Sequence, residues 1–328
     1  MDSGKKKSAQ VWFWVRVIGS AVFVGLLLRL VDFSELIDLL KHGEFVFYLA
    51  ALGLFAINQL GFTWRWRSLL SALAIDVKIG HLLKVYLLGF AWNLVLPTNV
   101  GGDAVKIYRL IQDVPERKAE ILAATLVDRI IGMFALLHWC LLGVWLASSW
   151  TLDARVALTM IIGGGLLIGY AAIVFNFLTP LTYLLERIHL SAKIGGYAQR
   201  VIEAFGVFRR ALPVLGFALL LSLVSQLVYV INQYLLLRTI GLNVSLSYLL
   251  LVIPLVTLVS ALPISLGGIG ILEAGLTVLL GPVGVSATQV VSYSMLRYSI
   301  PILLGLVISV NNLIHVLRSS IQRISHRN

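Results

Sequence analysis

Two arginines lie deep inside apolar segments of this sequence, where a positive charge needs a reason. Arg129 lies in VDRIIGMFALL, about nine residues into one apolar stretch, and Arg297 lies in SMLRYSIPILLG, about eleven residues into another. A charged arginine at the centre of a bilayer costs about 2.5 to 3.5 kcal/mol on translocon scales, so each side chain is expected to face protein or water. Each guanidinium either neutralises a carboxylate, for which Asp103, Asp128 and Glu273 are the candidates, or helps to bind an anionic substrate, and the two roles are compatible.

Two acidic residues lie in comparable settings. Asp103 directly follows Gly102, where its side-chain oxygen could cap a helix, bind substrate or handle a proton. Glu273, in GGIGILEAGL, lies five residues past Gly268 and is the only acid between Glu203 and the C-terminus. A carboxylate in so apolar a segment needs a partner, which makes Glu273 a candidate for proton coupling.

Further polar residues complete the candidate set. Lys106 and Arg109 are three residues apart, so they share one face of a helix and could meet lipid phosphates at a cytoplasmic mouth, or simply extend to the interface. Asn93 could line a path or form an interhelical hydrogen bond. The candidate substrate-binding residues are Asn93, Asp103, Lys106, Arg109, Asp128, Arg129, Glu273 and Arg297.

The acids follow two similar motifs, LPTNVGG and LPISLGG, which are predicted to break helices. A proline removes a backbone donor and a glycine pair permits unusual dihedral angles, so a helix should stop at each proline and restart after the glycines, at about Gly102 and Gly268. The restarted helices would direct N–H groups at a cavity, which favours an anion; a hinge without a ligand is the alternative. The predicted helix-break residues are Pro97, Gly101, Gly102, Pro263, Gly267 and Gly268.

The composition is that of an integral membrane protein. Hydrophobic residues make up 59% of the 328 positions and charged residues 12%, against about 45–50% and about 25% in soluble domains. The net charge of +11 comes from basic residues beside apolar segments, which indicates the positive-inside bias and argues against nucleic-acid binding. Cys140 is the single cysteine, and motifs for a metal, a cofactor or a hydrolytic enzyme do not stand out.

Six apolar segments are long enough to be complete crossings, and two more are broken by the Pro and Gly-Gly motifs. We therefore expect an all-α polytopic membrane protein with about six full transmembrane helices and two re-entrant hairpins. The crossings lie at about 11–31, 45–62, 120–147, 155–178, 213–237 and 287–316, and the hairpins at about 80–112 and 247–282.

Loop charge orients these segments, because cytoplasmic loops carry an excess of Lys and Arg. The loop at 32–44 has four acids against Lys41 and is predicted to be external. Stretch 80–112 then starts and ends in the cytoplasm, whereas stretch 247–282 starts and ends outside, so the two hairpins enter from opposite faces. The basic residues that place the loop before the first hairpin are Arg65, Arg67, Lys78 and Lys84.

The opposite hairpins predict an inverted repeat in one membrane domain over residues 1–328. The first repeat covers 45–147 and the second 213–316, joined by a cytoplasmic linker at 181–211 that is either a surface helix or an ordinary connection. Both halves also contain the triplet INQ before the hairpin and an intramembrane arginine after it. We expect a protein of the cell membrane with both termini on the cytoplasmic side.

The motifs carry a resemblance to a known family. Asn93 with LPTNVGGDAVKIYRL, then LVDRIIG and LPISLGGIGILEAG, resembles the flippase-like family built around the transmembrane region of lysylphosphatidylglycerol synthases. The resemblance implies re-entrant helices and the movement of lipids between leaflets. A soluble synthase domain after the membrane part is not expected, so lysyl transfer is in doubt. The resemblance gives importance to Asn93, Pro97, Gly101, Gly102, Asp103, Asp128, Arg129, Gly267, Gly268 and Glu273.

The function expected from the sequence is translocation of an anionic phospholipid or lipid-linked molecule between leaflets, through a midplane cavity between the hairpins. The alternatives are a membrane-embedded enzyme or accessory subunit acting on lipid-linked substrates, and a transporter of soluble anions. The expected partners are membrane lipids or a polyprenyl-linked substrate, and an enzyme of lipid or cell-envelope synthesis. Nucleic acid, cofactors and metals are not expected.

Overall fold

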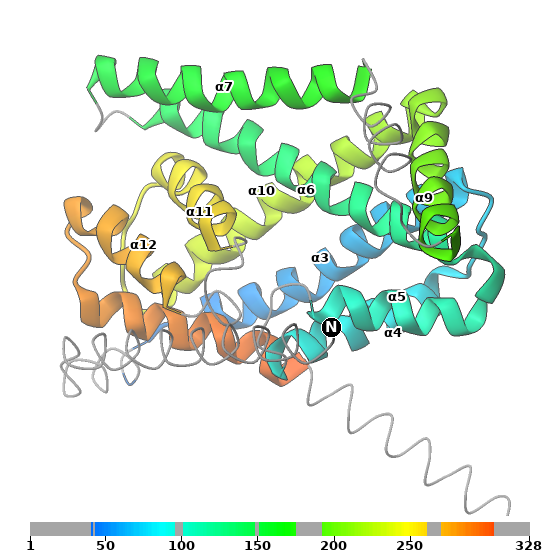
Figure 1. The fold of residues 1–328 in the computed structure, drawn as a ribbon. Coiled ribbons are helices and arrows are strands. Elements are labelled where there is room, and N and C mark those ends of the chain that lie inside the picture. Colours follow the sequence, from blue (N-terminus) through cyan, green and yellow to red (C-terminus); the bar gives the residue numbers. More distant parts are fainter. Residues whose placement is uncertain are drawn as a thin grey trace, which may run out of the picture.

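The structure, a computed structural model, describes residues 43–95, 101–147, 151–174, 192–260 and 270–304, together with Lys41. Within these ranges every regular element is a helix (Figure 1). The helices are α3 (Phe45–Ala72), α4 (Ile79–Val95), α5 (Gly101–Asp113), η1 (Pro115–Arg117), α6 (Lys118–Leu146), α7 (Leu152–Val174), α9 (Ala192–Arg210), α10 (Leu212–Thr239), α11 (Leu246–Ser260), α12 (Ile271–Leu280), η2 (Gly281–Val283) and a last helix over 287–304.

Four described helices are long and apolar enough to cross a membrane, namely α3, α6 with η1, α7 and α10. They overlap the predicted crossings at 45–62, 120–147, 155–178 and 213–237, of which residues 175–178 lie outside the described part, so the all-helical, multi-spanning class is confirmed. The predicted crossing at 11–31 lies outside the described residues, as does the end of 287–316. The count of six crossings therefore stays a prediction.

The helices α3 and α10 form an antiparallel pair through the middle of the molecule (Figure 1). The Asn58 side chain donates to the carbonyl of Ser225 at 3.1 Å, and Asn232 donates to the carbonyl of Ala51 at 2.6 Å. A Cβ on Gly61 would lie only 2.7 Å from the Ser225 hydroxyl oxygen, so a glycine allows the close approach. Small residues and amide hydrogen bonds are typical of helix packing in membranes, where the lipid is as apolar as the side chains.

The helix α6 packs against both partners of this pair and against α11. At the α11 contact, a Cβ on Gly143 would lie 2.6 Å from the carbonyl carbon of Leu250, so only a glycine permits this backbone approach. In contrast, α7 contacts α6 and exposes large apolar side chains such as Ile161 and Leu167, as expected of a helix that faces lipid.

The described helices repeat in the same order. A long helix, a shorter apolar helix, a second short helix, a 3₁₀ turn and a further helix occur as α3–α4–α5–η1–α6 and again as α10–α11–α12–η2–287–304. The same three backbone hydrogen bonds close α3 and α10, and each end has a residue in the left-handed region, Ala74 (φ 57°) and Gly241 (φ 75°). Because α3 and α10 are antiparallel, the two series run in opposite directions. An inverted orientation across a bilayer stays a prediction.

The INQ triplets are not equivalent in this register. Asn58 lies fourteen residues before the end of α3, whereas Asn232 lies seven residues before the end of α10. Both amides nevertheless face the α3–α10 contact, because a seven-residue shift is close to two helical turns. The triplets therefore mark one interface rather than one duplicated position.

The predicted hairpins correspond to the contacting pairs α4–α5 and α11–α12. The residues between the partners, 96–100 and 261–269, lie outside the described residues, and with them Pro97, Pro263, Gly267 and Gly268. Gly101 and Gly102 are the first two residues of α5. Re-entry of either pair from one face stays a prediction.

The predicted linker at 181–211 contains the helix α9, which packs against α6 and α10. It buries Ala204 and Phe208 against the apolar cluster around Trp66, and it exposes Arg200 and Arg210. The amphipathic pattern of this segment is therefore used, at least in part, for packing on the protein itself.

Candidate functional site

A cluster of three charged residues, here the Asp103 cluster, lies where α5 meets α6. Asp103 is in the first turn of α5, and its Oδ1 lies 2.7 Å from the Lys106 ammonium. Arg129 Nε, from α6, donates to the other carboxylate oxygen. Two cations share one carboxylate, so these three residues carry one formal positive charge. The N-terminal position of Asp103 also suits the helix dipole.

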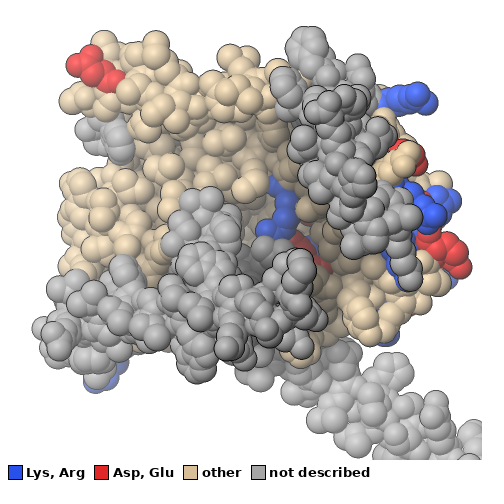
Figure 2. Space-filling model, viewed as in Figure 1, with Lys and Arg blue, Asp and Glu red and all other residues tan. Residues whose placement is uncertain are grey.

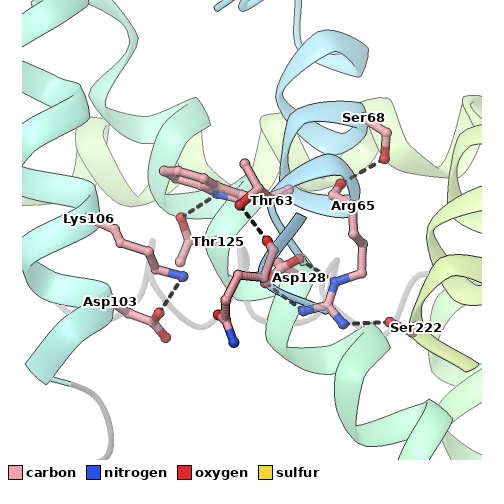
Figure 3. Close-up of polar contacts among 10 residues, drawn as sticks. Thr63, Arg65, Ser68, Asp103, Lys106, Thr125, Asp128 and Ser222 are labelled. Carbon is pink, nitrogen blue, oxygen red and sulfur yellow. Dashed lines mark hydrogen bonds and ion pairs between the residues drawn. The ribbon is translucent and has the colours of Figure 1, made fainter. Parts of the chain in front are cut away.

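Lys106 is held within the protein and is only 5% exposed. Its ammonium lies 4.4 Å from the ring centroid of Tyr86 and 5.2 Å from that of Trp66, within the range of cation–π attraction. A Cβ on Gly89 in α4 would lie 2.5 Å from the carbonyl oxygen of Gly102, so a glycine permits α4 to approach α5 here. The close packing of α4 on α5 therefore positions Lys106, whose ammonium contacts Asp103 (Figure 3).

A second, fully buried ion pair joins α3 to α6 beside this cluster. Arg65 Nε and Nη2 donate to the two carboxylate oxygens of Asp128 at 2.6 and 2.9 Å. The remaining terminal nitrogen donates to the Ser222 hydroxyl of α10 at 2.6 Å (Figure 3). The two charged side chains are 6% and 5% exposed. Bidentate geometry with a third acceptor is what a buried arginine needs to offset its desolvation.

Arg65 corrects the sequence analysis, which placed it in a cytoplasmic loop. The helix α3 continues to Ala72, ten residues past the predicted end at 62, so Arg65 and Arg67 lie inside a helix. Lys84 likewise lies inside α4, so the loop-charge argument for the first hairpin keeps only Lys78 of its four basic residues between helices. In the structure the buried positions 58, 59, 63, 65, 66, 69 and 70 follow a helical period through the arginine, although four of them are polar and did not mark a buried face in the sequence.

The adjacent residues Asp128 and Arg129 have separate partners. Asp128 binds Arg65 of α3, whereas Arg129 binds Asp103 of α5. The Arg129 side chain is 35% exposed, in contrast to its neighbour. Figure 2 shows basic and acidic side chains at the bottom of a hollow in an otherwise uncharged part of this face. The ion-pair role expected for Arg129 is thus present, and its exposure leaves room for a second role.

Glu273 has a capping role in the second series of helices. Its Oε2 accepts the backbone N–H of Gly270 at 2.6 Å, and its Oε1 accepts the Tyr298 hydroxyl at 2.9 Å. The helix α12 begins at Ile271, not near Gly268, so Glu273 lies in the first turn rather than beyond it. Glu273 and Asp103 are each the third residue of their helix. Proton coupling through Glu273 stays a prediction.

Arg297 has a different environment from Arg129. Its Nη2 donates to the Tyr229 hydroxyl at 3.2 Å, and its guanidinium carbon lies 5.5 Å from the ring centroid of Tyr298. Its Nη1 is shielded from solvent and has no hydrogen-bond partner among the described residues. No ion pair joins Arg297 to Glu273 in the part of the chain that the structure describes. The carboxylate partner considered for this arginine is therefore absent there.

The comparison with protein families agrees with the motifs. The family of the lysylphosphatidylglycerol synthase transmembrane region matches residues 13–309. This range includes Arg129, Arg297 and every described helix. The chain belongs to this family. It is also 26% identical over 300 residues to a UPF0104 membrane protein of Methanothermobacter thermautotrophicus, covering 82% of this chain and 85% of that protein. The family resemblance expected from the motifs is confirmed, and the chain is a membrane protein.

Two candidate residues, Arg109 and Asn93, lie apart from these clusters or cannot be placed. Arg109 is exposed and donates to Gln112 at 2.8 Å, while Lys106 is buried on Asp103, so the two do not form one basic face. A role for Lys106 or Arg109 at a lipid phosphate stays a prediction. Asn93 is in α4, but its side chain lies outside the described part. Among the described residues, no group of three His, Cys, Asp or Glu side chains could hold a metal.

Proposed function

We propose that the protein translocates an anionic phospholipid or lipid-linked molecule between the leaflets of a cell membrane. The headgroup would pass through a midplane cavity between the pairs α4–α5 and α11–α12, while the acyl or prenyl chains stay in lipid. The observation that carries the proposal is the Asp103 cluster, a net positive site with a partly exposed arginine inside an apolar helical protein. Membership of the lysylphosphatidylglycerol synthase transmembrane family supports a role connected with lipids.

The charge balance of the Asp103 cluster suits a phosphodiester. Lys106 and Arg129 together carry two positive charges against one carboxylate. One phosphate charge would neutralise the site, and charge-assisted hydrogen bonds from a guanidinium to phosphate are among the stronger polar interactions. When a headgroup takes Arg129, Lys106 still neutralises Asp103. The site therefore accepts an anion without leaving a buried carboxylate unpaired.

The repeated helix order supports alternating access. We propose that residues 45–147 and 213–316 are inverted repeats, that both short-helix pairs are re-entrant, and that both termini are cytoplasmic. The antiparallel α3–α10 pair and the matching ends of these helices support the first point. Rocking of one repeat against the other would expose the midplane site to each leaflet in turn.

Lipid exchange in vesicles tests the proposal. Purified protein is reconstituted with a trace of fluorescent phosphatidylglycerol in both leaflets, and an external reductant bleaches the outer leaflet. With the wild-type protein, we expect more lipid to be bleached than the outer-leaflet fraction. The exchange rate of Arg129→Gln should be at least tenfold lower, because one charge-assisted hydrogen bond contributes about 1.5–3 kcal/mol. Arg117→Gln is the matched control, since Arg117 is exposed at the start of α6 and pairs with Glu120.

Two outcomes would contradict the proposal. Failure to exchange any anionic lipid, or an Arg129→Gln rate equal to that of the wild type, would remove its basis. Chromatography of the lipids after incubation separates the alternative of a membrane-embedded enzyme, because a new lipid species would then appear. An accessory role predicts neither exchange nor conversion by the purified protein alone.

A further inference from the structure

A small pocket lies in the second series of helices. Its polar lining residues are Tyr229, Thr257, Tyr293 and Arg297, and its other four lining side chains are aliphatic residues of α11 and α12. The pocket has about enough space for one water-sized group. The pocket can therefore hold one oxygen-bearing corner of a ligand, but not a whole headgroup.

Two hydrogen-bond donors at this pocket lack an acceptor among the described residues. Nη1 of Arg297 is buried and unpartnered. The Tyr229 oxygen accepts from Nη2 of the same arginine, so the tyrosine hydroxyl hydrogen is not used in that bond. A buried donor without an acceptor costs about 1–3 kcal/mol, and more when it is charged, so an occupant that accepts both hydrogens is favoured.

The other polar groups of the pocket have already used their hydrogens. The Thr257 hydroxyl donates to the carbonyl of Ile253 at 2.7 Å, and the Tyr293 hydroxyl donates to Gln233 Oε1 at 2.5 Å. None of the described lining residues is acidic, so the charge of Arg297 is not balanced within the pocket. A water molecule would satisfy a hydrogen bond but not this charge, whereas an anionic oxygen satisfies both.

We propose that this pocket is a second anion subsite, which takes one anionic oxygen of a phosphate group on Arg297 Nη1 and the Tyr229 hydroxyl. It differs from the Asp103 cluster, where the protein supplies its own counterion. The phosphate belongs either to a lipid headgroup or to free inorganic phosphate, which present the same oxygen. The lipid source rests on the proposed function, whereas the subsite itself does not.

Binding measurements on the full-length protein test the subsite. In one arm, the protein in phosphatidylcholine nanodiscs receives increasing phosphatidylglycerol, and native mass spectrometry counts the retained anionic lipid. In the other arm, inorganic phosphate is titrated and the rise in unfolding temperature gives its affinity. We expect Arg297→Gln to weaken the bound ligand at least tenfold, because a charged donor is lost.

Two further variants separate the pocket from general damage. Val256→Leu leaves every polar group in place and adds a methylene to the pocket wall, so it should also weaken binding at least fivefold. Thr257→Val should change affinity less than twofold, since this hydroxyl already donates to a backbone carbonyl. Val256→Leu stays informative even if Arg297→Gln does not fold.

The results distinguish a lipid headgroup from free phosphate as the ligand, and they separate the anion subsite at Arg297 from the proposed transport site at Arg129. Loss of lipid binding without an effect of phosphate identifies a lipid headgroup, and the reverse result identifies free phosphate; either supports the subsite. Wild-type affinity of both Arg297→Gln and Val256→Leu for both ligands would overturn it and leave water as the occupant. Lipid exchange that is insensitive to Arg129→Gln, with binding still dependent on Arg297, would contradict the proposed transport site but not this subsite.

Discussion

The buried pair of Arg65 and Asp128 gives a stability prediction that the structure makes specific. Replacing Arg65 by Met keeps a long side chain in α3 but removes both hydrogen bonds to Asp128 and the one to Ser222. The carboxylate, at 5% exposure, would be left without a charged partner. Breaking a buried ion pair on one side typically costs about 3–5 kcal/mol, and we expect a loss of unfolding free energy in that range.

The double variant Arg65→Met with Asp128→Leu should be much less affected. It removes both desolvated charges together, and replacing a buried pair by apolar residues is often close to neutral. We therefore expect a coupling free energy of at least about 2 kcal/mol between the two positions. The exposed pair of Arg117 and Glu120 is the matched control, for which Arg117→Gln should cost at most about 1 kcal/mol.

Equilibrium unfolding in mixed micelles, followed by tryptophan fluorescence, measures these differences under one condition. The five proteins compared are the wild type, Arg65→Met, Asp128→Leu, the double variant and the control Arg117→Gln. The reasoning fails if Arg65→Met lowers the unfolding free energy by less than about 1 kcal/mol, since an unpaired buried carboxylate should destabilise the fold by more than that. It also fails if the double variant loses the sum of the two single losses, because the two charges would then not interact.

Three further predictions follow from close contacts and charge. Gly89→Ala should destabilise the protein by about 1–3 kcal/mol in the same unfolding assay, because the new methyl group overlaps α5, while Gly80→Ala, with open space around it, should be neutral or stabilising by up to about 1 kcal/mol. Gly143→Ala should cost more than Gly89→Ala, because the nearest atoms to a Cβ on Gly143 are all backbone atoms of α11, whereas a Cβ on Gly89 meets one backbone oxygen and the flexible Lys106 side chain. Asp103→Asn should bind anionic lipid at least tenfold more tightly but exchange it more slowly in vesicles, because the internal competitor for the cations is lost.

The long helices could be predicted from the sequence because apolar length alone defines a membrane span. The predicted crossings at 120–147 and 213–237 agree within two residues with α6 and α10. The helix α3 was cut short because Arg65 and Arg67 were interpreted as basic residues of a cytoplasmic loop. What overrides that pattern is a carboxylate 63 residues away, which no local pattern can reveal.

The candidate site was predictable only in part, because its contacts also join residues that are far apart in the sequence. The sequence pointed to Arg129 and to Asp103 as one possible partner, and the structure joins them. It could not show that Lys106 turns inward, since that depends on the rings of Tyr86 and Trp66 from two other helices. The tyrosine beside Arg297 likewise comes from α10, 68 residues earlier.

The two series of helices use one backbone plan with different charge pairing. In both, an acid is the third residue of the short second helix, and an arginine follows in the next helix. Asp103 binds its arginine, whereas Glu273 is occupied by the N–H of Gly270 and by Tyr298. Because Gly270 has a positive φ of 92°, its N–H points back to the glutamate as a capping interaction.

This difference in charge pairing predicts different affinities for an anionic oxygen at Arg129 and at Arg297. A headgroup at Arg129 must displace Asp103, whereas Nη1 of Arg297 has no hydrogen-bond partner among the described residues that a headgroup would have to displace. In the arrangement described here, the second site should therefore bind an anionic oxygen more tightly than the first. A conformational change that moved α5 away from α6 would separate Asp103 from Arg129 and reverse that order. Asp103 then competes with the headgroup for Arg129 and helps to release it, so Asp103→Asn should slow exchange even though it tightens binding.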